Sequence, residues 1–205
     1  MLVIIDYGLG NLRSILHKLH KIKVEACISS NAAEIEKADK LILPGVGHFA
    51  IGIKNICDLN SIDVLIRKVL EEKTPILGIC LGMQLLTRRS EEGSVDGLGW
   101  VNAQTNKFNF NSSDEKLKIP HVGWNTIKIT KKNKLLEGIP TGSRFYFTHS
   151  YHLDFVENDT VLATTDYGYD FVSVIQKNNI YGTQFHPEKS HKIGMKIIQN
   201  FVENC

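Results

Sequence analysis

The chain has 205 residues, of which 42% are hydrophobic and 22% are charged, and its net charge at pH 7 is +2. This length and composition are typical of a single globular domain, which we expect to cover residues 1–205. The small net charge gives no electrostatic footprint for nucleic acid or a membrane surface, so the sequence predicts no partner of either kind.

The first half of the chain alternates short apolar runs with segments of helical periodicity, which predicts repeated βα units. Such units form a parallel sheet covered by helices on both faces, and ligands bind at the carboxyl ends of its strands. We expect strands at 2–5, 24–28, 40–43 and 75–79, and helices at 11–21, 32–38, 62–70 and 83–89.

The second half, from about Gly97 to His186, changes to short alternating segments, which predicts antiparallel or mixed strands in the same domain. A last helix is predicted from about Lys192. The fold class is therefore α/β, with a mostly parallel central sheet flanked by helices and a β-rich second half. Turn signals separate the later strands at 109–113, 140–142, 157–159 and 177–179.

The cysteines and the N-terminus indicate a protein of the reducing cytoplasm. The four cysteines, at positions 27, 57, 80 and 205, lie far apart and have no C-x-x-C spacing. This argues against a disulfide framework and a zinc site, and we expect no metal or other cofactor. Residues 1–6 lack the basic start of a signal peptide, and no apolar run is long enough to span a bilayer.

Cys80 lies at the predicted strand-to-helix turn, in the string Gly78-Ile79-Cys80-Leu81-Gly82. This is the thiol version of the nucleophile elbow, in which side chains at the two glycine positions would collide with neighbouring backbone. The bend would place the sulfur near a helix N-terminus, which favours the thiolate. Taken alone, the motif fits a buried structural cysteine equally well.

His186-Pro187-Glu188 supplies the base and the carboxylate that a thiol nucleophile needs. In an extended segment, residues two apart point to the same side, so Glu188 can lie beside the His186 ring. Without the elbow, the tripeptide could equally be a turn with a solvated glutamate. Of the other histidines, we expect His149 and His152 to be structural or to line a pocket wall.

Pro44-Gly45-Val46-Gly47 ends another predicted strand on the same edge of the sheet as Cys80. Its backbone N–H groups, together with that of Leu81, could hold a developing oxyanion. The alternative is an ordinary β-to-α loop. A dinucleotide site after the first strand is rejected, because Arg13 stands where the third glycine of that motif would be.

Taken together, these motifs are similar to those of class I glutamine amidotransferases, and in particular of the glutaminase subunit of imidazole glycerol phosphate synthase (HisH). The cysteine elbow and H-P-E mark the superfamily, whereas PGVG, IDYGLGN and HVGWN mark the subfamily. The matching strings are IDYGLGN at 5–11, LPGVGHF at 43–49, GICLGMQLL at 78–86, RSEEG at 89–93, PHVGWN at 120–125, FYFTHSY at 145–151 and QFHPEKS at 184–190.

The resemblance implies that Cys80 attacks the side-chain amide of L-glutamine and forms a γ-glutamyl thioester. His186 would carry the proton to the leaving ammonia, and Glu188 would orient His186. The oxyanion would be held by N–H groups around Gly45, Val46 and Leu81. Substrate recognition is expected from Gln84 and from the backbone of His149, Ser150 and Tyr151.

The resemblance also implies a partner, a (β/α)8-barrel cyclase subunit (HisF-like) that forms a heterodimer with the glutaminase. Ammonia would pass to it and enter imidazole glycerol phosphate and AICAR in histidine biosynthesis. Asn11, Trp124 and Lys189 are the expected interface positions. In this family the free glutaminase is poorly active, and the PGVG strand is thought to reorient when the partner binds its ligand.

Two alternatives stay open at the level of sequence. The segments at 88–93, 97–100 and 189–195 look closer to paralogues found beside surface-polysaccharide genes, which are proposed to supply ammonia for amidation of a nucleotide-sugar. An alternative of another class is a stand-alone hydrolase with the same cysteine elbow, or a subunit without catalysis. The intact H-P-E and HVGWN strings argue against both members of that class.

Overall fold

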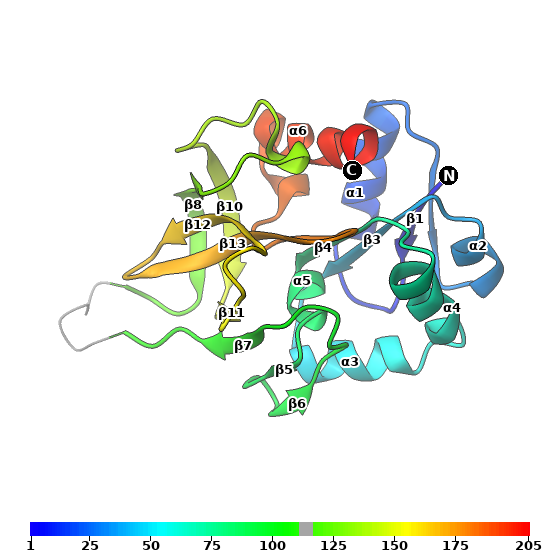
Figure 1. Cartoon of the computed structure of the whole chain (residues 1–205), viewed down its shortest axis with the longest axis horizontal. Coiled ribbons are helices and arrows are strands. Elements are labelled where there is room, and N and C mark those ends of the chain that lie inside the picture. The colour runs from blue at the N-terminus through cyan, green and yellow to red at the C-terminus, as the bar shows by residue number, and fades with distance from the viewer. Residues whose placement is uncertain (111–116) are drawn as a thin grey trace.

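The computed structural model describes residues 1–110 and 117–205, and a mixed sheet of 12 strands runs through it (Figure 1). Its parallel part is formed by the strands expected from the first half of the chain, with one strand from the C-terminal region added at the edge of β4. In spatial order these strands are β2 (Ala26–Ser29), β1 (Leu2–Ile5), β3 (Lys40–Gly45), β4 (Ile76–Cys80) and β14 (Ile180–Thr183).

Helices cover both faces of the parallel strands because these strands are apolar on both sides. Leu2 and Ile4 of β1 pack with α1 (Leu12–Lys21) and α6 (His191–Asn204). Val3 and Ile5 point to the opposite core. That core is covered by α2 (Ala32–Glu36), α3 (Phe49–Cys57), α4 (Ile62–Ile66) with the π-helical turn Arg67–Glu71, and α5 (Leu81–Leu85).

The second half is largely antiparallel, which confirms the predicted change of character. Its strands in the large sheet are β5 (Arg89–Ser90), β6 (Val95–Asp96), β7 (Gln104–Lys107), β9 (Lys128–Ile129), β11 (Tyr151–Asp154), β12 (Val161–Asp166) and β13 (Asp170–Lys177). A separate antiparallel pair is formed by β8 (His121–Thr126) and β10 (Arg144–His149). Of the predicted turn at 109–113, residues 111–113 lie outside the described residues.

One predicted helix ends earlier than expected, and one helix was not predicted. The helix expected at 83–89 ends at Leu85, because backbone N–H groups of Leu98 and Val101 occupy the carbonyls of Leu85 and Leu86. The chain then enters β5 instead of another helical turn. Helix α3 was not predicted, because Gly52 interrupts its pattern and its cap is His48, whose Nδ1 accepts from the Ala50 N–H at 3.2 Å.

The glycines of the elbow are required by close backbone contacts. A Cβ atom on Gly82 would lie 1.8 Å from the Leu43 carbonyl oxygen, and one on Gly78 would lie 2.7 Å from Cα of Met83. The turn after β4 is therefore closed to any side chain at either position, as the sequence predicted.

Gly82→Ala should destabilise the fold by more than about 4 kcal/mol, because a backbone oxygen has no room to retreat from the added carbon. Gly142→Ala is the matched control, since a Cβ there meets nothing within 4 Å and only the φ of +83° opposes it. The control should cost about 1–2 kcal/mol. Urea unfolding measures the free energy of unfolding of both variants. An equal decrease in the two variants would contradict the packing described for the elbow.

In the part of the chain that the structure describes, no helix combines the length and the apolar character needed to cross a membrane.

Candidate active site

Cys80 is the last residue of β4 and precedes α5 directly. Its φ of +54° is unusual for a residue with a side chain, and only 6% of the residue is exposed. In the parallel register, Gly45 of β3 lies opposite Cys80. The carboxyl ends of the two strands therefore meet, as the spacing of the motifs predicted.

A pocket of about 210 Å³ opens onto Cys80. Val46 and Leu81 line it on the side of the sheet, and Thr148 to Tyr151 line the opposite side, so most of the residues expected to bind substrate surround one space. The volume is below that of pockets for drug-sized ligands and suits an amino acid. The remaining lining residues are Gly47, Gln84, Glu92 and Pro120.

His186 and Glu188 form a buried pair next to this pocket. Nδ1 of His186 lies 2.8 Å from Oε1 of Glu188, and both side chains are 1% exposed. The predicted contact is present, but the expected extended backbone is not, because Pro187–Lys189 forms a 3₁₀ turn. The turn brings the carboxylate back toward the ring. Among the described residues, Nε2 of His186 has no hydrogen-bond partner.

The electrostatics of the pair favour a charged imidazolium. Burial alone would lower the pKa of His186, but the nearby Cys80 sulfur and the Glu188 carboxylate raise it to about 10. Burial alone would raise the pKa of Glu188, but its bond to His186 lowers it below the ordinary value. The positive charge of the His186 ring is thus stabilised by a sulfur and by a carboxylate.

Asn11, which we expected at a partner surface, also contacts this pair. Its Nδ2 donates to Oε1 of Glu188 at 3.0 Å, so one carboxylate oxygen accepts bonds from both Asn11 and His186. Asn11 precedes α1 and is half-buried. It therefore belongs to the support of the site.

Gln84 is buried and fixed on the far side of the sulfur. Its Nε2 donates to the Tyr151 carbonyl at 2.8 Å and to Oε1 of Gln184 at 3.0 Å. The sequence reasoning did not single out Gln184, which has no exposed surface and whose Nε2 lies 3.7 Å from the Cys80 sulfur. Its position next to the H-P-E string was the signal that could have found it.

Glu92 is a second residue that the sequence reasoning left without a role. Of the described residues that line the pocket, it is the one with a carboxylate, and none is Lys or Arg. Its Oε2 accepts from the Phe49 N–H at 2.8 Å, which ties it to the start of α3. The string RSEEG contains two glutamates, and nothing in it indicates which one lines the pocket.

Trp124 and Lys189 lie near each other on an outer face. Trp124 is 38% exposed and stacks on His191 with ring centroids 5.0 Å apart. Nζ of Lys189 lies 5.7 Å from the ring centre of Tyr146, which contacts Trp124 edge-on. With Val122, which is 57% exposed, they form a partly apolar surface over β8, β10 and the 3₁₀ turn Pro187–Lys189.

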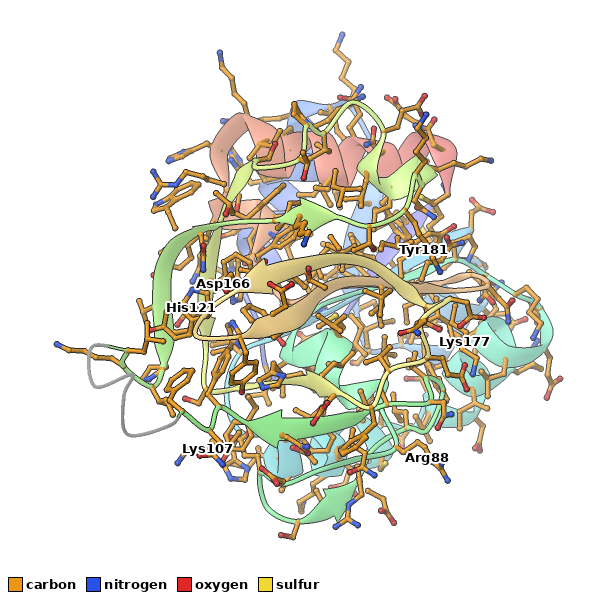
Figure 2. All side chains as sticks on the ribbon, turned by 60° about the vertical axis from the view of Figure 1, so that its left-hand side comes forward. Arg88, Lys107, His121, Asp166, Lys177 and Tyr181 are labelled. Atoms are coloured by element: carbon orange, nitrogen blue, oxygen red, sulfur yellow. The ribbon has the colours of Figure 1, made fainter. Side chains whose placement is uncertain are left out.

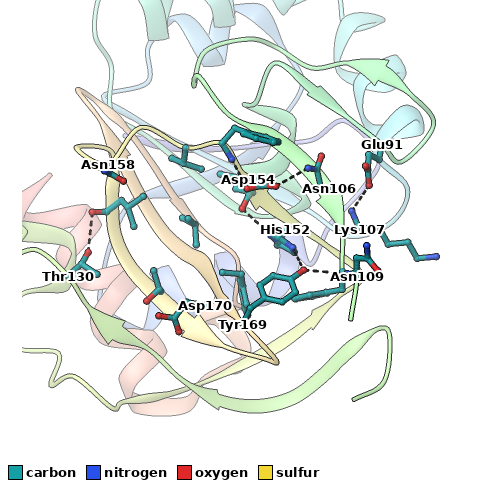
Figure 3. A pocket seen from close by; sticks show the side chains of 18 of the residues that line it. Glu91, Asn106, Lys107, Asn109, Thr130, His152, Asp154, Asn158, Tyr169 and Asp170 are labelled. Carbon is teal, nitrogen blue, oxygen red and sulfur yellow. Dashed lines mark hydrogen bonds between the residues drawn. The ribbon is translucent and has the colours of Figure 1, made fainter. Parts of the chain in front are cut away.

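A larger, open depression of about 1190 Å³ lies beside β7, β11 and β13 (Figure 3). It is lined by His152, Tyr169 and Asp154, but not by Cys80, His186 or Glu188. The smaller pocket is therefore the candidate site, because Cys80 lines it. No group of three metal-ligating side chains occurs within residues 1–110 and 117–205.

The chain belongs to the class-I glutamine amidotransferase family, whose model matches residues 3–205. It is 52% identical to imidazole glycerol phosphate synthase subunit HisH 2 of Methanococcus maripaludis over the full length of both chains. It is 47% identical to subunit HisH 1 of the same organism, with 99% of each chain covered. A solved glutamine amidotransferase shares the fold with a TM-score of 0.75 at 20% identity, covering 98% of this chain and 97% of that one.

Proposed function

We propose that this protein is the glutaminase subunit of an imidazole glycerol phosphate synthase, with Cys80 as nucleophile. The observation that carries the proposal is the elbow cysteine beside a buried His186–Glu188 pair, at the end of a pocket of amino-acid size. The full-length identity to HisH subunits supports the choice of this synthase. The protein would work in the cytoplasm, where thiols stay reduced.

The reaction follows from the positions of these groups. The Cys80 sulfur attacks the side-chain amide carbon of glutamine, and His186 gives its proton to the departing nitrogen as the C–N bond breaks. Ammonia leaves, and the glutamyl group stays on sulfur as a thioester. Water activated by His186 then cleaves the C–S bond to release glutamate. Glu188 stabilises the imidazolium, and N–H groups at Val46 and Leu81 stabilise the oxyanion.

Glu92 would bind the α-ammonium group of glutamine, because it is the carboxylate among the described lining residues. Glu92→Gln keeps the size and removes the charge, so KM for glutamine should rise by about 10- to 100-fold with a smaller change in kcat. Steady-state kinetics test this, with the neighbouring Glu91→Gln, which does not line this pocket, as control. An unchanged KM in the Glu92 variant would remove Glu92 from substrate binding.

Ammonia would pass to a (β/α)8-barrel cyclase in a heterodimer. The support for a docking face is the exposed, partly apolar surface around Trp124 and Lys189. Asn11 would connect that partner to the triad through Glu188.

The assay that tests the function is glutamate release from glutamine by the purified chain, alone and with a co-expressed cyclase. The proposal predicts release that rises when the cyclase and its ligand are added. Release that is the same with and without the cyclase would contradict transfer to this partner and favour a stand-alone hydrolase. No release under any condition would favour a subunit without catalysis.

A second acceptor is supported by one observation. Methanococcus maripaludis has two numbered HisH relatives, and this chain is 52% identical to the second and 47% identical to the first. A duplicated glutaminase is free to serve another pathway, such as amidation of a nucleotide-sugar for a surface polysaccharide. Complementation of a histidine auxotroph separates the two: failure despite good expression with its own partner would favour the second acceptor.

A further inference from the structure

A chain of hydrogen bonds runs behind the glutamine pocket, from strand β8 to the Tyr151 carbonyl. Nδ2 of Asn125 lies 3.3 Å from Nε2 of His121, whose Nδ1 lies 3.1 Å from Nε2 of His149. Nδ1 of His149 lies 2.8 Å from the Tyr151 carbonyl oxygen. Asn125 also donates to the Asp166 carbonyl at 2.8 Å; Figure 2 labels His121 and Asp166.

The Tyr151 carbonyl at one end and the Asn125 amide at the other fix the position of every proton in this series of hydrogen bonds. The Tyr151 carbonyl can only accept, so Nδ1 of His149 must carry a hydrogen. In a neutral ring Nε2 then has none and accepts from Nδ1 of His121. Nε2 of His121 in turn accepts from Asn125, whose amide orientation is fixed because its Oδ1 accepts from the Thr126 N–H at 2.7 Å. Both histidines are therefore Nδ1–H tautomers.

The surroundings keep both rings neutral. Tyr167 stacks on His121 with centroids 3.9 Å apart, and Phe108 lies 5.2 Å from His149. Burial among these rings lowers the pKa of His121 to about 4 and lowers that of His149 well below its ordinary value. In a charged ring Nε2 would also carry a hydrogen, so two N–H donors would face each other and that hydrogen bond would be lost.

This series of hydrogen bonds determines which polar atoms the pocket presents to a ligand. Tyr151 accepts from His149 and also from Gln84, so Gln84 must turn its nitrogen, and not its oxygen, toward this carbonyl. Both hydrogens of that nitrogen are used, because the second goes to Oε1 of Gln184. Oε1 of Gln84 is left to accept from a ligand, and Nε2 of Gln184 is left facing the Cys80 sulfur.

We propose that His149, held in one tautomer by His121, is a positioning residue for glutamine binding. It fixes the Tyr151 carbonyl and so the orientation of the Gln84 amide, which then offers an oxygen to the N–H groups of the substrate. The inference rests on the proposed function of the pocket. His152 provides a comparison, because it is equally buried but bonds the Leu153 carbonyl and the Tyr169 hydroxyl beside the larger depression (Figure 3).

The tautomers can be observed directly in the intact protein. Nuclear magnetic resonance of ¹⁵N-histidine-labelled protein at neutral pH should show His121 and His149 neutral and protonated on Nδ1. The two signals are assigned by their loss in His121→Phe and His149→Phe. A His149 ring that is charged, or protonated on Nε2, would overturn the proposal without any measurement of activity.

Steady-state kinetics test whether His149 affects glutamine binding. His149→Phe should raise KM for glutamine by about tenfold or more, because the Tyr151 carbonyl loses a donor. His149→Asn, whose amide nitrogen can replace Nδ1, should recover most of that loss, and His152→Phe should leave KM within about twofold. Equal KM values in the two Phe variants would overturn the inference. If the unaltered protein releases no glutamate, the proposed function fails instead, while the resonance test still decides the tautomers.

Discussion

Cys80→Ala should abolish glutamate release, lowering kcat/KM by more than about 10⁴-fold, because Cys80 is the one cysteine among the described residues that line the pocket. The substitution removes a sulfur that is buried at a strained position, where φ is +54°. Nε2 of His186 would then face no nucleophile. The fold should survive, since the elbow depends on Gly78 and Gly82, which stay unchanged.

The matched control is Cys57→Ala, because Cys57 is exposed and lies at the end of α3, outside the pocket lining. It should keep the activity of the unaltered protein. Far-ultraviolet circular dichroism and urea unfolding establish that both variants are folded. A folded Cys80→Ala protein that keeps more than about a tenth of the activity would remove Cys80 from its assigned role.

Glu188→Gln should lower kcat by about 10²- to 10⁴-fold, because a neutral amide no longer stabilises the His186 imidazolium. It should also change the pH profile. The sulfur of Cys80 and the carboxylate together raise the pKa of His186 to about 10, against the effect of burial. Without the carboxylate the imidazolium loses its proton more easily, so the decline of kcat/KM at alkaline pH should move to lower pH.

Asn11→Leu provides a graded comparison for this experiment. It removes one donor from Oε1 of Glu188 but leaves the carboxylate and its bond to His186. We expect kcat to fall by about tenfold, which is less than in Glu188→Gln. An alkaline limb that stays in place in Glu188→Gln would show that the carboxylate does not control the protonation of His186.

The elbow could be predicted from sequence because its signal is local. Glycines at 78 and 82 and an apolar run before Cys80 specify a strand that ends in a tight turn, and the backbone contacts at Gly82 give the reason. The meeting of Gly45 with Cys80 was also predictable, since parallel strands end at the same edge.

Other parts of the site depend on contacts between distant segments. Glu188 reaches His186 through a 3₁₀ turn. The carboxylate of Glu188 also accepts a hydrogen bond from Asn11, 177 positions away along the chain. The role of Gln184 depends on Gln84, 100 positions away. Helix α5 ends early because residues 98–101 bond its last carbonyls. The periodic pattern of the sequence does not contain this information, because each case depends on a contact between segments that are distant along the chain.

Mass spectrometry of the protein after acid quenching during turnover of glutamine detects the thioester on Cys80 directly. A fraction of the protein should carry one glutamyl group, and proteolysis should place it on the peptide that contains Cys80. The group should disappear when hydroxylamine cleaves the thioester, and it should be absent from Cys80→Ala. Glutamate release with the glutamyl group on Cys57 instead of Cys80, or on no cysteine at all under conditions that preserve thioesters, would show that Cys80 is not the nucleophile.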